Sequence, residues 1–183
     1  MIRYVLFLAL FVPVMLWGAS GFAQIVLGIN STINFGTYEF DTSHRVDIEM
    51  GTNGNIALAN QTGIVYSGGA SPGAVTISAT PQDVVEVKCD RSGRIIVQEN
   101  GQRLNINQLQ ISVDAGVPYG SGSSCDGVGG RRNPAAVIDL AANPDPVILI
   151  GGRLRVFRNR LVSGTHAASN TGGNDIRIRV IFQ

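Results

Sequence analysis

Asp175-Ile-Arg-Ile-Arg-Val-Ile-Phe-Gln183 is the stretch that decides the fold. Apolar residues occupy every second position from Ile176 to Phe182, and two arginines stand between them. This alternation is typical of a β-strand with one buried face and one exposed face. A run of the same character, Val147-Ile-Leu-Ile-Gly-Gly-Arg-Leu-Arg-Val-Phe157, comes earlier in the chain. We predict that the two runs are neighbouring strands of one antiparallel sheet.

The rest of the sequence is typical of an all-β protein. Short runs rich in Val and Ile alternate with Gly, Asn, Ser and Pro turns, and no segment has sustained helical periodicity. Arg45-Val-Asp-Ile-Glu-Met50 is a clear strand, with its apolar residues on one face and Asp47 and Glu49 on the other, which we expect to be solvated. The pattern predicts an antiparallel β-sandwich of about nine to eleven short strands.

Two positions predict irregular strands. Gly36 directly follows the apolar Phe35, which indicates a bulge or a close approach of two backbones. Between Leu104 and Val113 the alternation of apolar residues changes register around Gln108. We therefore expect one strand region here, with a shift of register around Gln108.

The N-terminus has the pattern of a cleaved signal peptide. The positively charged Met1-Ile-Arg3 precedes an apolar run from Tyr4 to Trp17, and small residues follow. Gly21 and Ala23 suit the two small-residue positions before a cleavage point, so we place the cut between Ala23 and Gln24. A membrane anchor is the alternative, but a span needs about 20 apolar residues and this run is shorter.

Removing residues 1–23 leaves 160 of the 183 residues as one predicted domain, residues 24–183. Arg3 is the only charge lost, so 13 of the 14 basic residues remain against 13 acidic ones. A nucleic-acid surface would need an excess of basic residues, so we expect no nucleic-acid partner. No later apolar run is long enough to cross a bilayer, so we predict no integral membrane segment after signal cleavage.

Cys89 and Cys125 both follow the signal peptide and would therefore reach an oxidising compartment. A single disulfide between them is the natural interpretation. It would tie the end of one strand to the Gly/Ser-rich loop of residues 119–130. Two free thiols are the alternative, and a metal site is disfavoured because His44 and His166 have no ligand spacing.

No motif with catalytic specificity is present in the sequence. The chain has no His-Glu-x-x-His helix, no phosphate-binding loop and no nucleophile elbow. Its carboxylates form no pair that would suit glycoside hydrolysis. We therefore predict a protein that is not an enzyme and that uses no cofactor or metal.

Arginines on the outer faces of the two closing runs are the one unusual charge feature. If these runs pair, they form a basic stripe of Arg153, Arg155, Arg177 and Arg179. Such a stripe would contact an anionic surface polysaccharide or lipopolysaccharide, or form salt bridges with an acidic strand face such as that of Asp47 and Glu49. Ordinary solubility and protection of a sheet edge by charge are the simpler explanation of the stripe.

Four short segments, in this order, resemble motifs of pilin-like bacterial domains. They are Ile33-Asn-Phe-Gly-Thr-Tyr38, Gly68-Gly-Ala-Ser-Pro-Gly-Ala-Val-Thr-Ile-Ser78, Ile150-Gly-Gly-Arg-Leu-Arg-Val156, and Ser163-Gly-Thr-His166 with the closing strand to Gln183. The chain resembles an uncharacterised secreted family related to the major subunits of Mat/Ecp-type common fimbriae. His166 stands where that family usually has an aromatic residue, and the cysteine pair is an addition.

The resemblance implies an immunoglobulin-like β-sandwich that is exported to the periplasm or the cell surface and takes part in fimbriae. Its partners would be further copies or other fimbrial subunits, with a periplasmic chaperone. The implied mechanism is strand addition, in which an extended segment of one subunit completes the sandwich of the next. The donor would be the mature N-terminus, with Ile25, Leu27 and Ile29 as its apolar side chains. The same residues also suit the first strand of a self-complete sandwich.

A monomeric, secreted carbohydrate- or surface-binding sandwich is the alternative function. Exposed aromatic side chains gathered on one face would favour it. Aromatic residues make up 7% of the chain, and the one tryptophan, Trp17, lies in the predicted signal peptide. The leading expectation is therefore a structural protein of the fimbrial-subunit type.

Overall fold

A computed structural model of the chain describes residues 24–40, 45–59, 63–79, 83–91, 105–125, 134–156 and 177–183. The predicted signal peptide, including Ala23, lies outside the described residues. The described residues form strands and turns, and none of them lies in a helix. Every strand pair is antiparallel, which confirms the all-β prediction. The described residues contain twelve strands, slightly more than predicted. The shortest strands have two or three residues, which is too short for alternation to be recognised in the sequence.

The larger sheet has seven strands arranged around one long central strand, β11 (Val147–Val156). One edge of β11 pairs first with β6 (Gly73–Ser78) and then with β3 (Val46–Met50). Its other edge pairs with β8 (Asn105–Val113). The outer positions belong to β1 (Val26–Ser31) beside β6, β4 (Ile56–Leu58) beside β3, and β9 (Ser123–Ser124) beside β8.

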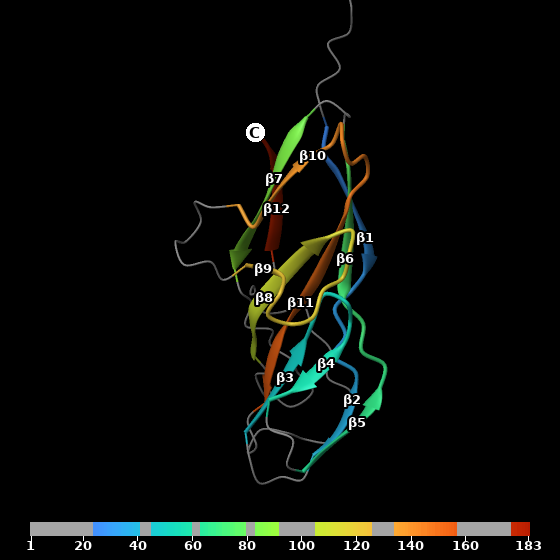
Figure 1. Cartoon of the computed structure of the whole chain (residues 1–183), viewed down its shortest axis with the longest axis vertical. Helices are drawn as coiled ribbons and strands as arrows, with labels where there is room; N and C mark the ends of the chain where they lie inside the picture. The colour runs from blue at the N-terminus through green and yellow to red at the C-terminus, as the bar shows by residue number, and fades with distance from the viewer. Residues whose placement is uncertain are drawn as a thin grey trace, which may run out of the picture.

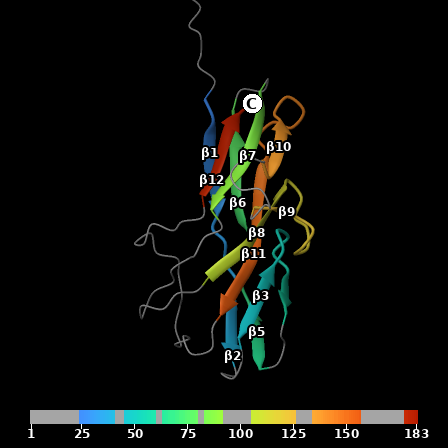
Figure 2. The same cartoon turned by 90° about the vertical axis from the view of Figure 1, so that its left-hand side faces the viewer.

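Two smaller sheets complete the structure. One has three strands in the order β10 (Ala136–Asp139), β7 (Val84–Arg91) and β12 (Arg177–Phe182). The other is a two-stranded sheet of β2 (Thr37–Phe40) and β5 (Ile64–Gly68). Figures 1 and 2 show the three-stranded sheet lying over one end of the larger sheet, while β2 and β5 lie at the opposite end of the molecule. The arrangement is therefore a sandwich of antiparallel sheets.

The prediction that the two arginine-bearing runs pair with each other is wrong. They form β11 and β12, and these strands belong to different sheets. Both edges of β11 are already paired, with β6 and β3 on one side and with β8 on the other. The backbone of β12 pairs instead with β7.

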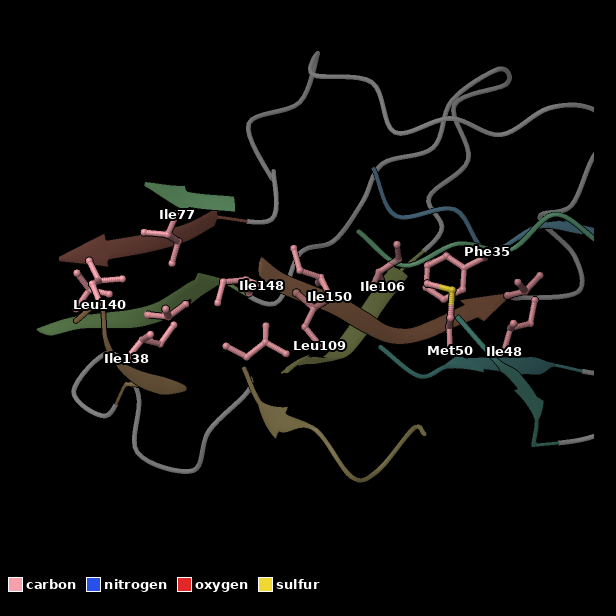
Figure 3. Packing of buried hydrophobic residues seen from close by; sticks show 14 of the residues in the cluster. Phe35, Ile48, Met50, Ile77, Ile106, Leu109, Ile138, Leu140, Ile148 and Ile150 are labelled. Atoms are coloured by element: carbon pink, nitrogen blue, oxygen red, sulfur yellow. The ribbon is translucent and has the colours of Figure 1, made fainter. Parts of the chain in front are cut away.

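The hydrophobic core runs along the long axis of the molecule between these sheets (Figure 3). Val85, Val87 and Ile138 enter it from the three-stranded sheet. The larger sheet contributes a continuous series of buried side chains: Val46, Ile48, Met50, Ile77, Ile106, Leu109, Ile111, Ile148, Ile150 and Val156. The inward face predicted for the apolar residues of β3 is thereby confirmed.

Both predicted irregularities are confirmed. Gln108 has a positive φ of 49°, and the register between β8 and β11 shifts between Gly151 and Arg153. Gly36 has a φ of 92°, and a Cβ atom there would lie 2.7 Å from the carbonyl oxygen of Gly68 and from the ring of Tyr66. Only glycine fits such a close approach of two backbones without strain.

One edge of the molecule is a long, interrupted ribbon. β1 and β2 follow one another along the chain in nearly the same direction, and both pair antiparallel with the returning segment of β5 and β6 (Figure 1). Between the two ladders, Asn34 and Ser71 form an isolated bridge with N···O distances of 2.9 and 2.8 Å. The ribbon therefore spans residues 26–40 on one side and 64–78 on the other.

Candidate assembly surface

β1 occupies an outer edge of the larger sheet and pairs along one side only, with β6. Residues Val26–Ile29 are in unbroken register with Ser78–Val75, and Asn30 is an extra residue before the ladder resumes at Ser31. Among the described residues, no strand pairs with the other side of β1. Its outward-directed backbone N–H and C=O groups form a template that another strand can join.

The apolar side chains of β1 are exposed on both of its faces. Leu27 lies opposite the fully buried Ile77, and Ile29 lies opposite Val75, so both point to the inner face of the sheet. Nevertheless Leu27 is 43% exposed and Ile29 is 77% exposed. Val26, on the outer face, is 52% exposed. The core therefore covers the inner face of β6 but leaves that of β1 largely uncovered.

The structure places the three predicted donor residues in and just before β1. Ile25 precedes the strand and packs against the core, whereas Leu27 and Ile29 lie on the inner face and remain accessible. The prediction did not include Val26, which alternates with these residues and lies on the opposite face of the strand. The sequence nevertheless contained a feature that indicates an unprotected edge strand here, because no charged residue occurs from Gln24 to Phe35.

Most of the other described sheet edges carry protective features, such as short length, a charge or a bulge. β4 and β9 have three and two residues. Glu39 on β2, Asp139 on β10 and Arg179 on β12 place exposed charges on those edges. β5 has no charge, but Ser67 is bulged out of its ladder with β2. Among the described sheet edges, the longest uncharged run in regular register is therefore Val26–Ile29 in β1.

The predicted basic stripe does not form, because its arginines are divided between two sheets. Arg155 is opposite Asp47 in the ladder between β11 and β3, and it donates from Nε to Oδ1 at 3.0 Å and from Nη2 to Oδ2 at 3.3 Å. Arg45 donates to Oδ2 at 2.9 Å. Arg153 Nη1 lies 3.9 Å from the same oxygen, and its Nε donates to Asn107. The salt-bridge alternative is thus the observed one for Arg153 and Arg155.

Asp47 itself is 6% exposed, so the expectation that it lies on a solvated face is wrong. The arginine side chains lie across the outer face of the sheet and cover the carboxylate. Burial by itself would raise the pKa of Asp47, but the hydrogen bonds and charges of Arg45 and Arg155 outweigh it and hold the pKa below its ordinary value. This cluster is therefore a neutralising structural contact between β3 and β11.

The other two arginines of the predicted stripe lie on β12, in the three-stranded sheet. Arg179 is exposed and stands opposite Lys88 of β7 in the ladder. The backbone of Arg177 pairs with that of Arg91, and the side chains of both lie outside what the structure describes. Lys88 is paired with Glu86 of its own strand at 2.6 Å.

Cys89 and Cys125 form the predicted disulfide, with a Cα–Cα distance of 5.2 Å. Cys89 belongs to β7 of the three-stranded sheet, and Cys125 directly follows β9 of the larger sheet. The backbone N–H of Cys125 also donates to the carbonyl of Leu109 in β8. The disulfide therefore joins the two layers of the sandwich covalently.

Comparison of the chain with protein-family models, with curated proteins and with solved structures found no match. Within the described ranges, no group of three or more His, Cys, Asp or Glu residues is placed to hold a metal ion. The same part of the chain contains no apolar helix of the length that a bilayer crossing requires. The candidate site is thus defined by its geometry alone.

Proposed function

We propose that this chain is an exported, non-enzymatic structural protein of the fimbrial-subunit type, whose N-terminal strand joins one copy to the next. In this proposal residues 1–23 are a cleaved signal peptide, and residues 24–183 are an immunoglobulin-like domain of the periplasm or cell surface. The observation that carries the proposal is β1, an uncharged apolar strand at a sheet edge, with exposed side chains on both faces.

The physical basis is strand addition. Backbone hydrogen bonds give such pairing its affinity, and side chains on alternate positions give it register. Burying the exposed parts of Val26, Leu27 and Ile29 at an interface would contribute on the order of 1 kcal/mol each. A monomer gains nothing from leaving these side chains in water, whereas an assembled subunit would bury them.

The disulfide supports the export part of the proposal. Disulfides persist in secreted and periplasmic proteins and are rare in the reducing cytosol. A bond between Cys89 and Cys125 that joins two layers of the fold therefore suits a protein that matures after export.

The carbohydrate-binding alternative needs a platform of exposed aromatic side chains. Among the described residues, the large exposed aromatic side chains are Tyr66 and Phe182, each 37% exposed. Tyr66 lies on β5 and Phe182 on β12, in different sheets. The Tyr66 ring also stacks on Tyr38 at a centroid distance of 5.0 Å, and its hydroxyl accepts a hydrogen bond from Ala70. No single face is therefore built for stacking on sugars within the described structure.

The proposal is tested by size-exclusion chromatography with light scattering on residues 24–183 and on a chain that begins at residue 32. We expect oligomers or ladders from the first protein and a monomer from the second, because the truncation removes β1. Since removing β1 also uncovers β6, a full-length Ile29→Lys variant serves as a second test. It keeps β6 paired while placing a charge on the exposed strand.

Circular dichroism and thermal unfolding establish that each variant is folded before its mass is compared. Stable monomers for all three proteins would overturn the proposal and redirect the search to glycan binding. Oligomers of equal size for all three would show that assembly uses another surface, which would also overturn the role given to β1.

A further inference from the structure

We propose that the outer face of β8 is a binding site for an acidic polysaccharide, whose carboxylates accept hydrogen bonds from the side-chain amides of Asn107, Gln108 and Gln110. These three residues are called the amide row below. The site is separate from β1, because β6 and β11 lie between β1 and β8 in the sheet. Recognition by hydrogen bonds needs no platform of exposed aromatic side chains, and it does not depend on whether the protein assembles.

A bulge in β8 brings the amide row to one face of the sheet. The ladder with β11 shifts register here, so that Gln108 and Leu109 together face the single residue Gly152. Leu109 is fully buried, whereas Gln108 is exposed and its neighbours Asn107 and Gln110 are half-buried. A strand without the bulge would direct Asn107 to one face and both glutamines to the other.

Gln108 holds this position at a cost in backbone conformation. Its φ of 49° lies in the left-handed region, which residues other than glycine and asparagine adopt only with strain. Because Gln108 is exposed, burial of its side chain does not compensate for that strain. Strained residues of this kind gather at functional sites, where the position of the side chain has a role.

Internal hydrogen bonds fix the orientation of two of the amides. Arg153 Nε donates to Asn107 Oδ1 at 3.0 Å, and the backbone N–H of Gly120 donates to Gln110 Oε1 at 2.9 Å. Both donor nitrogens carry a hydrogen and cannot accept, so their partner in each amide has to be the oxygen. The NH₂ groups of Asn107 and Gln110 are therefore the atoms left for a ligand.

The third amide is oriented in the same way. Gln108 Oε1 accepts a hydrogen bond from the Tyr119 hydroxyl. In the part of the chain that the structure describes, no group accepts from the three NH₂ groups. Strand residues rise about 3.3 Å each, so these donors extend over roughly 10 Å of β8. A row of donors with its oxygens already occupied suits a chain of repeated acceptors, such as the carboxylates of a polyuronate.

The charges beside the amide row favour an anion. Arg45, Arg153 and Arg155 lie around Asp47, and Glu49 is opposite Arg153 in the ladder, so three positive charges stand against two negative ones. Arg153 also separates Glu49 from the amide row, because β11 lies between β3 and β8. With so small an excess of positive charge, hydrogen bonding decides the ligand. A carboxylate is the more basic group and accepts more strongly than a sulfate ester.

Isothermal titration calorimetry of the purified protein with an oligogalacturonate tests the site. The methyl-esterified oligomer is the matched ligand, because it has the same sugars without charged carboxylates. We expect it to bind at least about tenfold more weakly, since charged acceptors form the stronger hydrogen bonds. No binding of the oligogalacturonate, or equal binding of the two ligands, would overturn the proposal. Tighter binding of a sulfated oligosaccharide of equal length would overturn the assignment to carboxylates.

Two isosteric variants locate the site. Asn107→Asp and Gln110→Glu replace the NH₂ group with an oxygen and keep the oxygen that accepts from Arg153 or Gly120. Each should weaken binding about tenfold or more, because a donor becomes a negatively charged acceptor. The matched control is Gln183→Glu, which adds the same charge to an exposed residue next to the end of β12, in the other layer, and should leave binding unchanged.

Gln108→Gly removes the third donor without adding a charge. Glycine adopts the φ of this position without strain, so we expect weaker binding together with a midpoint of urea unfolding no lower than that of the original protein. Urea unfolding of every variant separates loss of the site from loss of the fold. Unchanged binding in folded variants at all three positions of the amide row would overturn the proposal. A monomeric protein tests the site equally well, so failure of strand addition leaves this result interpretable.

Discussion

At the scale of single residues, Asp47 shows what alternation can and cannot predict. Alternation correctly places it opposite the apolar face of β3, but it does not predict its burial. The pattern identifies the face of a strand, whereas exposure depends on the neighbours across the sheet. Here the neighbours are Arg153 and Arg155, whose long side chains cover the carboxylate while their charges neutralise it.

Replacing this carboxylate should destabilise the fold in a pH-dependent way. Asp47→Asn removes charged hydrogen bonds from a buried site, so we expect a loss of about 2 kcal/mol in the free energy of unfolding at pH 7. Because the folded-state pKa of Asp47 is depressed, its contribution is complete above the ordinary carboxylate pKa of about 3.9 and disappears as pH falls through the folded value. Urea unfolding at pH 7 and pH 3 measures both effects.

The difference between the original protein and the Asp47→Asn variant should therefore shrink on acidification. Glu49→Gln is the matched control, since Glu49 lies on the same face two residues along β3. A difference that stayed constant from pH 7 to pH 3 would contradict the assigned role of the ion pairs.

At the scale of elements, the sequence predicted individual strands better than their partners. The inward residues of β3, the register shift of β8 around Gln108 and the close approach at Gly36 all follow from local pattern and were confirmed. The pairing of β11 with β12 was wrong, because both strands have the same alternation and alternation does not specify a neighbour. Contacts between strands distant in sequence depend on the packing of the entire chain.

Gly36 and Gly69 form a matched pair for measuring the close backbone approach in the edge ribbon. Both have positive φ values, 92° and 84°, but a Cβ atom at Gly69 would meet nothing within 4 Å. We expect Gly69→Ala to cost about 1 kcal/mol from backbone strain alone and Gly36→Ala to cost about 2–3 kcal/mol, because the steric contact adds to the strain. Thermal and urea unfolding measure the two costs. Equal costs would show that the backbone around Gly36 moves enough to accept the added methyl group.

At the scale of the whole molecule, the disulfide is the covalent link between the two layers. In the loop-closure description, a bond across 36 residues contributes about 4 kcal/mol by restricting the unfolded chain. The double variant Cys89→Ala/Cys125→Ala should therefore lose about this much stability, seen as a lower midpoint of urea unfolding. An unchanged midpoint would mean that the sheets hold together without the link.

The candidate site was also only partly predictable at this scale. The predicted donor segment was found from its apolar alternation, and its residues Leu27 and Ile29 are both exposed apolar side chains. The sequence could not show that β1 pairs with β6, or that the core does not extend as far as β1. Both facts depend on pairing between strands distant in the sequence, which makes one sheet seven strands wide and the other three.

The straight course of the chain from β1 to β2 has a mechanical consequence. Tension that reaches β1 through Thr32 and Ile33 acts along the strand axis, parallel to the ladder with β6. Such a load shears the backbone hydrogen bonds together, whereas a perpendicular pull would break them one after another. A fibre of subunits joined through β1 would therefore resist stretching along its strands more strongly than peeling from the side.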